Sequence, residues 1–301
     1  MSFKVIKPGF LSTVQDYGRF GHAHQGMSQS GAMDEHAYAW GNYLLNNRFD
    51  DACIEMTFGG LEIEAQIDTF VAVTGADLNF EINGQSQKMW HSLRINKGDR
   101  LSWGTPNTGV RSYLAVKGGF KTAVMFDSRS VNLRENIGNK ILPEEVLPCK
   151  GFSGANYRFT PPKFIPNYAD EVVLRVLPTY QFNEFNGNQK DLFFAQEYSI
   201  NNASDRSGCR LDGVPIKAKN ARMISEGVSY GAIEIAADGL PIIILKDGPS
   251  IGGYAKIGTV FSLDLAKLAQ KQPNSQVRFQ PMTMQDAQKE RKQFERFFKM
   301  F

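Results

Sequence analysis

One short segment reads Phe70-Val71-Ala72-Val73-Thr74-Gly75-Ala76-Asp77-Leu78-Asn79-Phe80-Glu81-Ile82-Asn83-Gly84. Its two apolar pieces, 70–74 and 78–82, have the length and the β-branched or aromatic content of strands. The pair Asn83-Gly84 then supplies the positive φ values that a two-residue hairpin needs. The segment therefore predicts β-strands and a tight turn.

The same sequence pattern recurs on both sides of this segment. Short apolar runs separated by turn residues lie at 53–58, 61–65, 100–103 and 112–116, and again at 171–177, 232–236, 241–246, 258–263 and 276–280. Such a series is typical of a β barrel or sandwich. Between the two series, residues 159–168 contain Pro161, Pro162 and Pro166, which lack the amide donor of a central strand. We therefore predict two domains, 1–160 and 167–301, a division that suits 301 residues.

Two helices interrupt the β pattern. Asp34 can cap a helix over 34–46, where apolar residues recur on one face. A second helix is expected from about Thr283 to the end, with an aromatic stripe of Phe294, Phe297, Phe298 and Phe301. The stripe favours packing over a ligand role, and its exposed part suggests an interface.

Composition excludes several classes of protein. The net charge is only +3 and the basic residues are scattered, whereas a nucleic-acid groove needs a concentrated basic face. The longest apolar runs, 241–245 and 70–73, are far shorter than the roughly 20 residues that cross a bilayer. The sequence does not begin with the apolar region of a signal peptide, so we expect a cytoplasmic protein. The three widely spaced cysteines fit reduced structural thiols.

Several apparent motifs fail on inspection. Residues 227–231 match G-x-S-x-G, yet a strand-like segment follows them and all four histidines precede Ser229. The Gly-rich stretches lack the G-K-[ST] ending of a phosphate loop. His22 and His24 share one face of an extended segment, but a catalytic zinc needs three protein ligands, so a surface pair is favoured and no metal is expected.

Four stretches are richer in Gly, Asp, Arg and small polar residues than packing requires. They are 8–34, 109–120, 204–213, and 225–228 together with 252–257. Loops of this kind bring backbone amides and guanidinium groups close to an anionic or carbonyl-bearing ligand. Together and in order, from Pro8 to about Phe279, they resemble the family of the C subunit of bacterial 5-oxoprolinase, the KipA antagonist protein, allophanate hydrolase subunit 2 and half of the urea carboxylase carboxyltransferase domain.

The resemblance implies a mainly β fold of two tandem cyclophilin-like β barrels with a few short helices. It also implies a complex with the KipI-like B subunit of 5-oxoprolinase and a possible A subunit, acting on a small amide or lactam. ATP would then act at the level of the complex. Carboxybiotin would come from another chain in the carboxyltransferase version, because Lys299-Met300 is no biotin carrier, and this chain alone would hold no cofactor.

The chain departs from the family pattern in three loops. The family pattern G-S-R-S-T is replaced by Asp127-Ser128-Arg129-Ser130-Val131, and the glycine pair expected downstream is replaced by Gly138-Asn139. The pattern Q-T-x-G-G-Y-P-K is replaced by Pro249-Ser250-Ile251-Gly252-Gly253-Tyr254-Ala255-Lys256. The pattern G-A-I-Q is replaced by Gly231-Ala232-Ile233-Glu234. These changes alter what the pockets can hydrogen-bond and their charge.

The candidate site residues come from these loops. A guanidinium offers a planar, permanently charged fork for a carboxylate or an oxyanion. On this basis we predict substrate binding by Arg111, Arg129, Asp205, Arg210, Gly252, Gly253 and Tyr254, and catalysis by Glu226, Lys256 and Arg206. Glu226 would act as general base and Lys256 as electrostatic clamp. The alternative is that the arginines pair with Asp16, Asp205 or Asp212 to pin loops, and that Glu226 and Lys256 are only solvated.

Two functions remain open at this point. The enzyme interpretation is a subunit of an ATP-dependent 5-oxoprolinase or a related carboxyltransferase complex. The binding interpretation is a non-catalytic, KipA-like antagonist of a KipI-like protein. Opening an unstrained amide needs an activated nucleophile or an activated carbonyl, and the sequence offers neither a Ser-His nor a Cys-His couple. We therefore expect the chain alone to be inactive.

Overall fold

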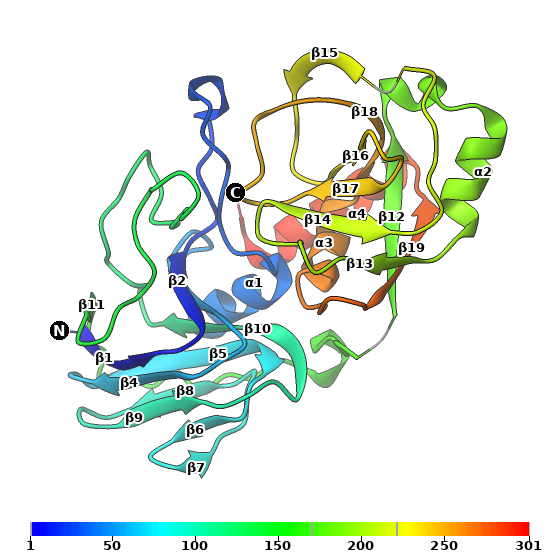
Figure 1. The fold of residues 1–301 in the computed structure, drawn as a ribbon. Helices are drawn as coiled ribbons and strands as arrows, with labels where there is room; N and C mark the ends of the chain where they lie inside the picture. Colours follow the sequence, from blue (N-terminus) through cyan, green and yellow to red (C-terminus); the bar gives the residue numbers. More distant parts are fainter. Residues whose placement is uncertain (1, 170, 221, 301) are drawn as a thin grey trace. The chain divides into compact units, whose positions relative to one another are not determined.

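The computed structural model describes residues 2–169, 171–220 and 222–300, which form two compact units (Figure 1). The first unit comprises residues 2–19, 30–169 and 295–300, and the second comprises 20–29, 171–220 and 222–294. Strands hold 36% of the residues and helices 18%, which confirms a mainly β fold with less than a quarter helix. The domain limits at 160 and 167 stay a prediction.

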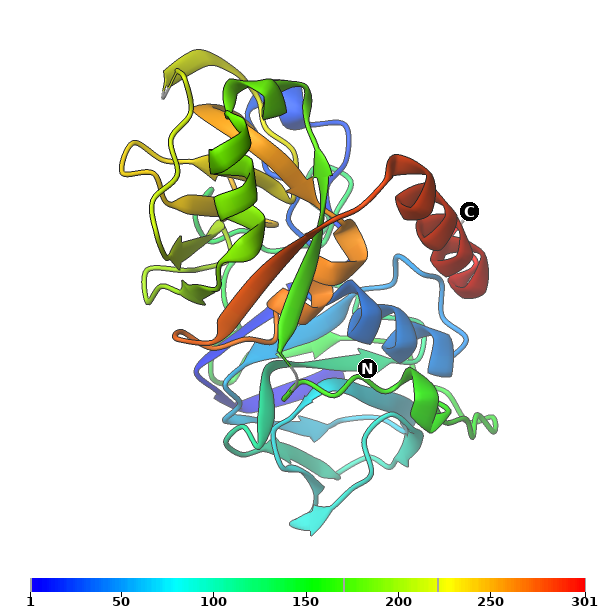
Figure 2. The same ribbon diagram turned by 90° about the vertical axis from the view of Figure 1, so that its right-hand side faces the viewer.

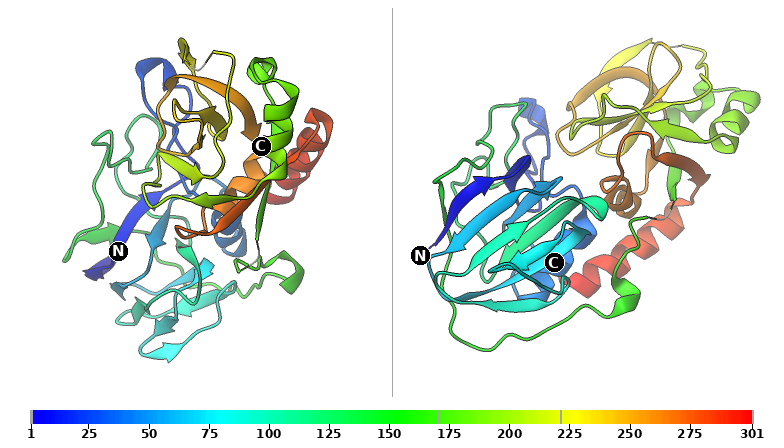
Figure 3. Two further views of the ribbon diagram at one scale, coloured as in Figure 1. Left: turned by 45° about the vertical axis from the view of Figure 1, so that its right-hand side comes forward. Right: turned by 60° about the horizontal axis from the view of Figure 1, so that its bottom comes forward.

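The first unit contains two antiparallel sheets. The six-stranded sheet has the order β11-β1-β4-β9-β6-β7, with β1 (Ser2–Pro8), β4 (Leu61–Ala65), β6 (Phe80–Ile82), β7 (Gln85–Ser86), β9 (Arg100–Trp103) and β11 (Val146–Pro148). The five-stranded sheet has the order β2-β3-β10-β5-β8, with β2 (Leu11–Gln15), β3 (Cys53–Thr57), β5 (Thr69–Asp77), β8 (Ser92–Ile95) and β10 (Thr108–Val116). Both sheets can be followed in the right-hand view of Figure 3.

The two sheets of this unit share one apolar core. Val5 and Ile63 from the six-stranded sheet, and Ile54, Val73 and Leu114 from the five-stranded sheet, are fully buried in the same cluster. Burial of such side chains contributes roughly 2 kcal/mol each. The three cysteines are buried thiols outside any disulfide, as predicted.

The predicted hairpin and helix cap are confirmed. Ile82 pairs with Gln85 across a two-residue turn, in which Asn83 and Gly84 have φ values of 52° and 74°. Helix α1 (Glu35–Leu44) packs on β5 and β10, and the Asp34 carboxylate accepts a hydrogen bond from Ala37 N at 2.9 Å. Local turn and cap chemistry therefore determined both features.

The second unit is built on a barrel. Its sheet has the order β12-β19-β13-β14-β17-β16-β18-β15, and β12 also pairs with β18, which closes seven strands into a ring. The strands are β12 (Val172–Pro178), β13 (Tyr198–Ile200), β14 (Gly208–Asp212), β15 (Arg222–Gly227), β16 (Ala232–Ile235), β17 (Pro241–Ile244), β18 (Ile251–Val260) and β19 (Gln276–Pro281). Only β12 and β19 pair in parallel among the described strands.

Two helices of this unit were missed in the sequence. Helix α2 (Gly187–Ala195) lies beside β19, as Figure 2 shows, and its Phe193 stacks on Phe279 with ring centroids 4.5 Å apart. Helix α3 (Ser262–Leu268) corrects the predicted strand 258–263, because β18 ends at Val260. The segment 258–263 is too short for its apolar residues to show a periodicity that separates strand from helix.

Short 3-10 turns and a last helix complete the described fold. The turns are η1 (Ala23–Gln25), η2 (Pro162–Phe164) and η3 (Tyr180–Glu184). Helix α4 (Met284–Phe298) begins one residue after the predicted Thr283. Phe297 stacks on Tyr43 at 5.3 Å and Phe298 is 8% exposed, so these rings pack within the first unit. This packing agrees with the packing role expected of the stripe, the interface stays a prediction, and Phe301 lies outside the described residues.

Candidate functional site

The structure brings Glu226 and Lys256 together in the second unit. Glu226 lies on β15 opposite Gly252 of β18, and Lys256 lies further along β18. The Lys256 Nζ and Glu226 Oε1 atoms are 2.6 Å apart, with 6% of the lysine side chain and 35% of the glutamate side chain exposed. Two residues predicted from separate loops thus form one partly desolvated ion pair.

Two residues of η3, Tyr180 and Gln181, complete this cluster. The Tyr180 hydroxyl donates to Glu226 Oε2, while Gln181 Nε2 donates to Glu226 Oε1 and to the Tyr180 oxygen, both at 2.8 Å. The backbone N–H of Lys256 in turn donates to Gln181 Oε1 at 2.8 Å. No sequence signal pointed to either residue, because η3 meets β15 and β18 only through the fold.

These contacts tune the ionisation of the cluster. Hydrogen bonding to Lys256, and then to Tyr180, lowers the pKa of Glu226, so Glu226 is a carboxylate at neutral pH. Donation to Glu226 raises the pKa of the Tyr180 hydroxyl, which therefore keeps its proton. The cluster presents one anion, one ammonium and one phenol to its surroundings.

Glu234 is a third carboxyl group beside the pair. It lies on β16 opposite Lys256, is 5% exposed, and its Oε1 has no hydrogen-bond partner among the described residues. Burial raises the pKa of Glu234, partly offset by the charge of Lys256 and a backbone hydrogen bond from Tyr254. A Cβ on Gly252 would lie 2.1 Å from Glu234 Oε1, so this side chain, and not a ligand, occupies the space over that glycine.

A cavity of about 560 Å³ adjoins the cluster. Tyr180, Glu226, Ser229 and Lys256 line it together with apolar residues such as Leu177. A donor and an acceptor on one wall can hydrogen-bond the C=O and the N–H of an amide at the same time. Ser229 belongs to the rejected G-x-S-x-G match, and strand β16 follows it as expected.

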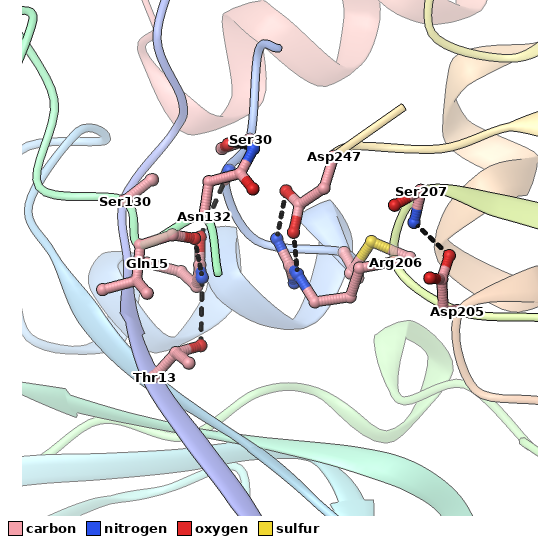
Figure 4. A network of polar contacts seen from close by, with 12 residues as sticks. Thr13, Gln15, Ser30, Ser130, Asn132, Asp205, Arg206, Ser207 and Asp247 are labelled. Atoms are coloured by element: carbon pink, nitrogen blue, oxygen red, sulfur yellow. Dashed lines mark hydrogen bonds and ion pairs between the residues drawn. The ribbon is translucent and has the colours of Figure 1, made fainter. Parts of the chain in front are cut away.

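The structure does not bring the 204–213 loop into this cavity. Arg206 makes a bidentate ion pair with Asp247, Nε to Oδ2 at 2.7 Å and Nη2 to Oδ1 at 3.1 Å, in which both side chains are largely buried (Figure 4). Asp205 accepts the N–H of Ser207 at 2.6 Å and so holds its own turn. Arg210 is exposed on β14. Arg206 therefore has a carboxylate partner, as in the loop-pinning alternative but with Asp247 as the acid, and its role stays a prediction.

Several of the remaining predicted residues do not line this cavity. A Cβ on Gly253 would make a tight contact of 3.3 Å with Ser225 Oγ, and Tyr254 is half-buried on β18. In the first unit, Arg111 Nε lies 3.7 Å from Glu55 Oε1. Glu55 also accepts a hydrogen bond from the Tyr113 hydroxyl at 2.7 Å, so Arg111 belongs to a buried structural network.

The altered loop 127–131 of the first unit is anchored by Asp16. The Asp16 carboxylate accepts hydrogen bonds from the hydroxyls of Ser128 and Ser130 and from the Arg129 N–H at 2.6 Å. Figure 4 shows the adjoining contacts, in which Gln15 donates to Thr13 at 3.0 Å and Asn132 to Ser30 at 3.1 Å. Asp127 has a φ of 59°, a conformation that suits the glycine of the family pattern and that Asp tolerates better than most residues.

Two features are absent from the described residues. No helix among them is both long and apolar enough to cross a membrane. In the same ranges, no group of three or more His, Cys, Asp or Glu side chains is placed to hold a metal ion.

Comparison with known proteins gives a consistent set of relatives. The family model for the carboxyltransferase domain, subdomain A and B, matches residues 25–281. The C subunit of 5-oxoprolinase from Escherichia coli (strain K12) is 30% identical over 98% of this chain and 96% of its own length, and that of Haemophilus influenzae is 30% identical over 94% and 92%. The crystal structure of the K. lactis urea amidolyase matches with a TM-score of 0.89 and 25% identity, covering 98% of this chain and 20% of that one.

Proposed function

Because the chain belongs to the carboxyltransferase domain family, subdomain A and B, we propose that it is one subunit of a cytoplasmic complex that opens 5-oxoproline or a related small lactam or amide. The observation that carries this proposal is the Glu226–Lys256 pair on the wall of the cavity of about 560 Å³. The two bacterial relatives, each named as the C subunit of 5-oxoprolinase, support the substrate class.

The geometry suggests how the pair would act. The Lys256 ammonium would polarise the amide carbonyl and stabilise negative charge on its oxygen. The Glu226 carboxylate would accept the amide N–H and orient the ring. Tyr180 and Gln181 would hold Glu226 in place while the substrate displaces part of its contact with Lys256. Positioning and electrostatic activation are thus the contribution of this chain.

The other requirements would be met by partner chains. The KipI-like B subunit and the A subunit would supply ATP chemistry, which the sequence of this chain does not encode in a phosphate loop. In a carboxyltransferase version, carboxybiotin on another chain would supply a transferable carboxyl group. The donor and acceptor of Lys256 and Glu226 fit its ureido group as they fit a lactam.

The test is to purify the chain with its partner chains and measure ATP hydrolysis with and without 5-oxoproline. We expect the substrate to stimulate hydrolysis in the wild-type complex, and Lys256→Met and Glu226→Gln each to reduce the stimulated rate about 100-fold. Lys217→Met is the matched control, because it removes an exposed ammonium of the same unit. A full complex with no stimulated turnover would overturn the lactam-opening function.

A second candidate function is a non-catalytic, KipA-like antagonist of a KipI-like protein. The altered loops 127–131 and 249–255 favour it, since they replace residues of the family pattern. Stoichiometric binding to the KipI-like partner, without substrate-stimulated turnover in the full set of chains, would decide for this candidate.

A further inference from the structure

The first unit has a smaller cavity of its own, with a volume of about 200 Å³. Its polar lining includes Thr122, Arg129, Asn139 and Glu145, and its apolar lining includes Val131 and Ile137. An engineered cavity of about 150 Å³ holds benzene, so this one has room for about eight to ten non-hydrogen atoms. Its dimensions suit a small metabolite.

Two buried polar atoms of this lining have no partner in the described part of the chain. Arg129 Nε and Thr122 Oγ1 are both buried and make no hydrogen bond among the described residues. Buried polar groups are nearly always hydrogen-bonded, so two such donors on one cavity point to a ligand acceptor. The neighbouring hydroxyls of Ser128 and Ser130 are already bonded to Asp16. Arg129 and Thr122 are therefore the donors left for a ligand.

The charges of the lining are also arranged for a ligand with two polar ends. Arg129 and Glu145 line the same cavity, yet within the described residues their charged atoms form no ion pair. Glu145 Oε2 accepts the Leu142 N–H at 2.9 Å, which holds the carboxylate in place. An acceptor group facing Arg129 and an N–H facing Glu145 would satisfy both charges.

The walls of the cavity are preorganised. The Arg129 N–H is held by Asp16, and Asn132 and Ile137 exchange backbone hydrogen bonds of 2.8 and 2.9 Å. Gly138, with a φ of 71°, lies so close to Val131 that a Cβ would approach Val131 Cγ2 to 3.0 Å. A rigid site loses little conformational entropy when it binds a ligand.

From these observations we propose that this cavity is a second ligand site, which binds a small carboxylate with an N–H on its α carbon. The carboxylate faces the Arg129 guanidinium and the Thr122 hydroxyl, the N–H faces Glu145, and the aliphatic body lies against Val131 and Ile137. L-Proline, with a charged secondary ammonium, and 5-oxoproline, with a neutral lactam N–H, both carry this chemistry. Isobutyrate has the carboxylate and no N–H.

The test is calorimetric titration of the full chain with L-proline, 5-oxoproline and isobutyrate. We expect L-proline or 5-oxoproline to bind at least about 10-fold tighter than isobutyrate, a difference of about 1.4 kcal/mol. Arg129→Met should weaken that binding about 10-fold and Thr122→Val about 3-fold, the latter without loss of stability, since its hydroxyl has no partner among the described residues. Glu145→Gln should weaken L-proline more than 5-oxoproline.

Lys256→Met separates this site from the cavity of the second unit. Binding that survives Lys256→Met and is weakened by Thr122→Val supports the second site, whatever the outcome for 5-oxoproline turnover. Loss of binding in Lys256→Met together with unchanged affinity in Arg129→Met and Thr122→Val would overturn it. Failure of the wild-type chain to bind either N–H-bearing probe would overturn it as well.

Discussion

At the scale of single residues, Glu234 is a carboxyl group that is almost completely buried away from water. Burial raises its pKa, so the folded chain holds this proton at a pH where the unfolded chain has released it. Below the unfolded pKa the group is neutral in both states and stability is unaffected. As the pH rises towards and past the folded pKa, the native state loses stability relative to the unfolded chain.

We therefore predict that Glu234→Gln stabilises the protein at pH 8 by about 1 kcal/mol, or about 2 °C in Tm, and has little effect at pH 4. Gln is also the residue of the family pattern at this position. Thermal unfolding at the two pH values checks the prediction, with the exposed Glu171→Gln as control. A Tm that falls at pH 8 would show that attraction to Lys256 outweighs the cost of burial.

The role of Arg206 can be decided by a similar comparison. Removing one partner of a buried ion pair leaves the other charge uncompensated, so Arg206→Met should lower the free energy of unfolding by about 3 kcal/mol. Arg206→Lys keeps the charge and loses the planar fork, and should cost less. Urea denaturation measures both. If Arg206→Met leaves the chain stable but abolishes the activity of the complex, that result would instead support the catalytic role predicted from the sequence.

At the scale of elements, the end of α4 is fixed by aromatic packing within the first unit. Phe298 is 8% exposed and meets Trp40 edge-on at 5.5 Å, whereas Phe297 is 40% exposed. We predict that Phe298→Ala costs about 3 kcal/mol and Phe297→Ala about 1 kcal/mol, because the cost follows the area that each ring buries.

Chemical denaturation followed by tryptophan fluorescence measures this difference directly, since the buried Trp40 reports on the same cluster. The reverse order of costs would mean that Phe297 carries more of the packing than its exposure indicates. Equal costs near zero would show that the helix end contributes nothing to the stability of the unit.

At the scale of the whole molecule, the chain is better equipped to position and polarise a substrate than to open it without partner chains. The cluster around Glu226 contains hydrogen-bond donors and acceptors. Ser229 lines the same cavity, but a strand follows it and all four histidines precede it in the sequence. We predict that the isolated chain turns over 5-oxoproline at least about 100-fold more slowly than the complex, because the proposed ATP chemistry would come from the partner chains. Assay of the chain with and without its partners checks this, and comparable rates would reveal an overlooked catalytic group.

Sequence alone determined the features that depend on neighbours along the chain. The Asn83-Gly84 turn, the Asp34 cap of α1 and most strands of both series follow from backbone preferences and alternation over a few residues. The same reasoning failed at the start of α3, where the short segment 258–263 fits a strand or a helix equally well. Glu226 and Lys256 could be singled out because glycines lie close to both in the sequence.

Only the tertiary structure decided which residues Glu226, Lys256 and Arg206 contact. Long-range strand pairing places β15 beside β18, and η3 contacts β18, so Gln181 reaches a backbone amide 75 residues away. It also gives Arg206 the carboxylate of Asp247, 41 residues further on, and not a nearby acid. The physical reason is that strand order and register set long-range contacts, whereas propensity acts over a few residues. The site is thus a property of the folded second unit and not of any one segment.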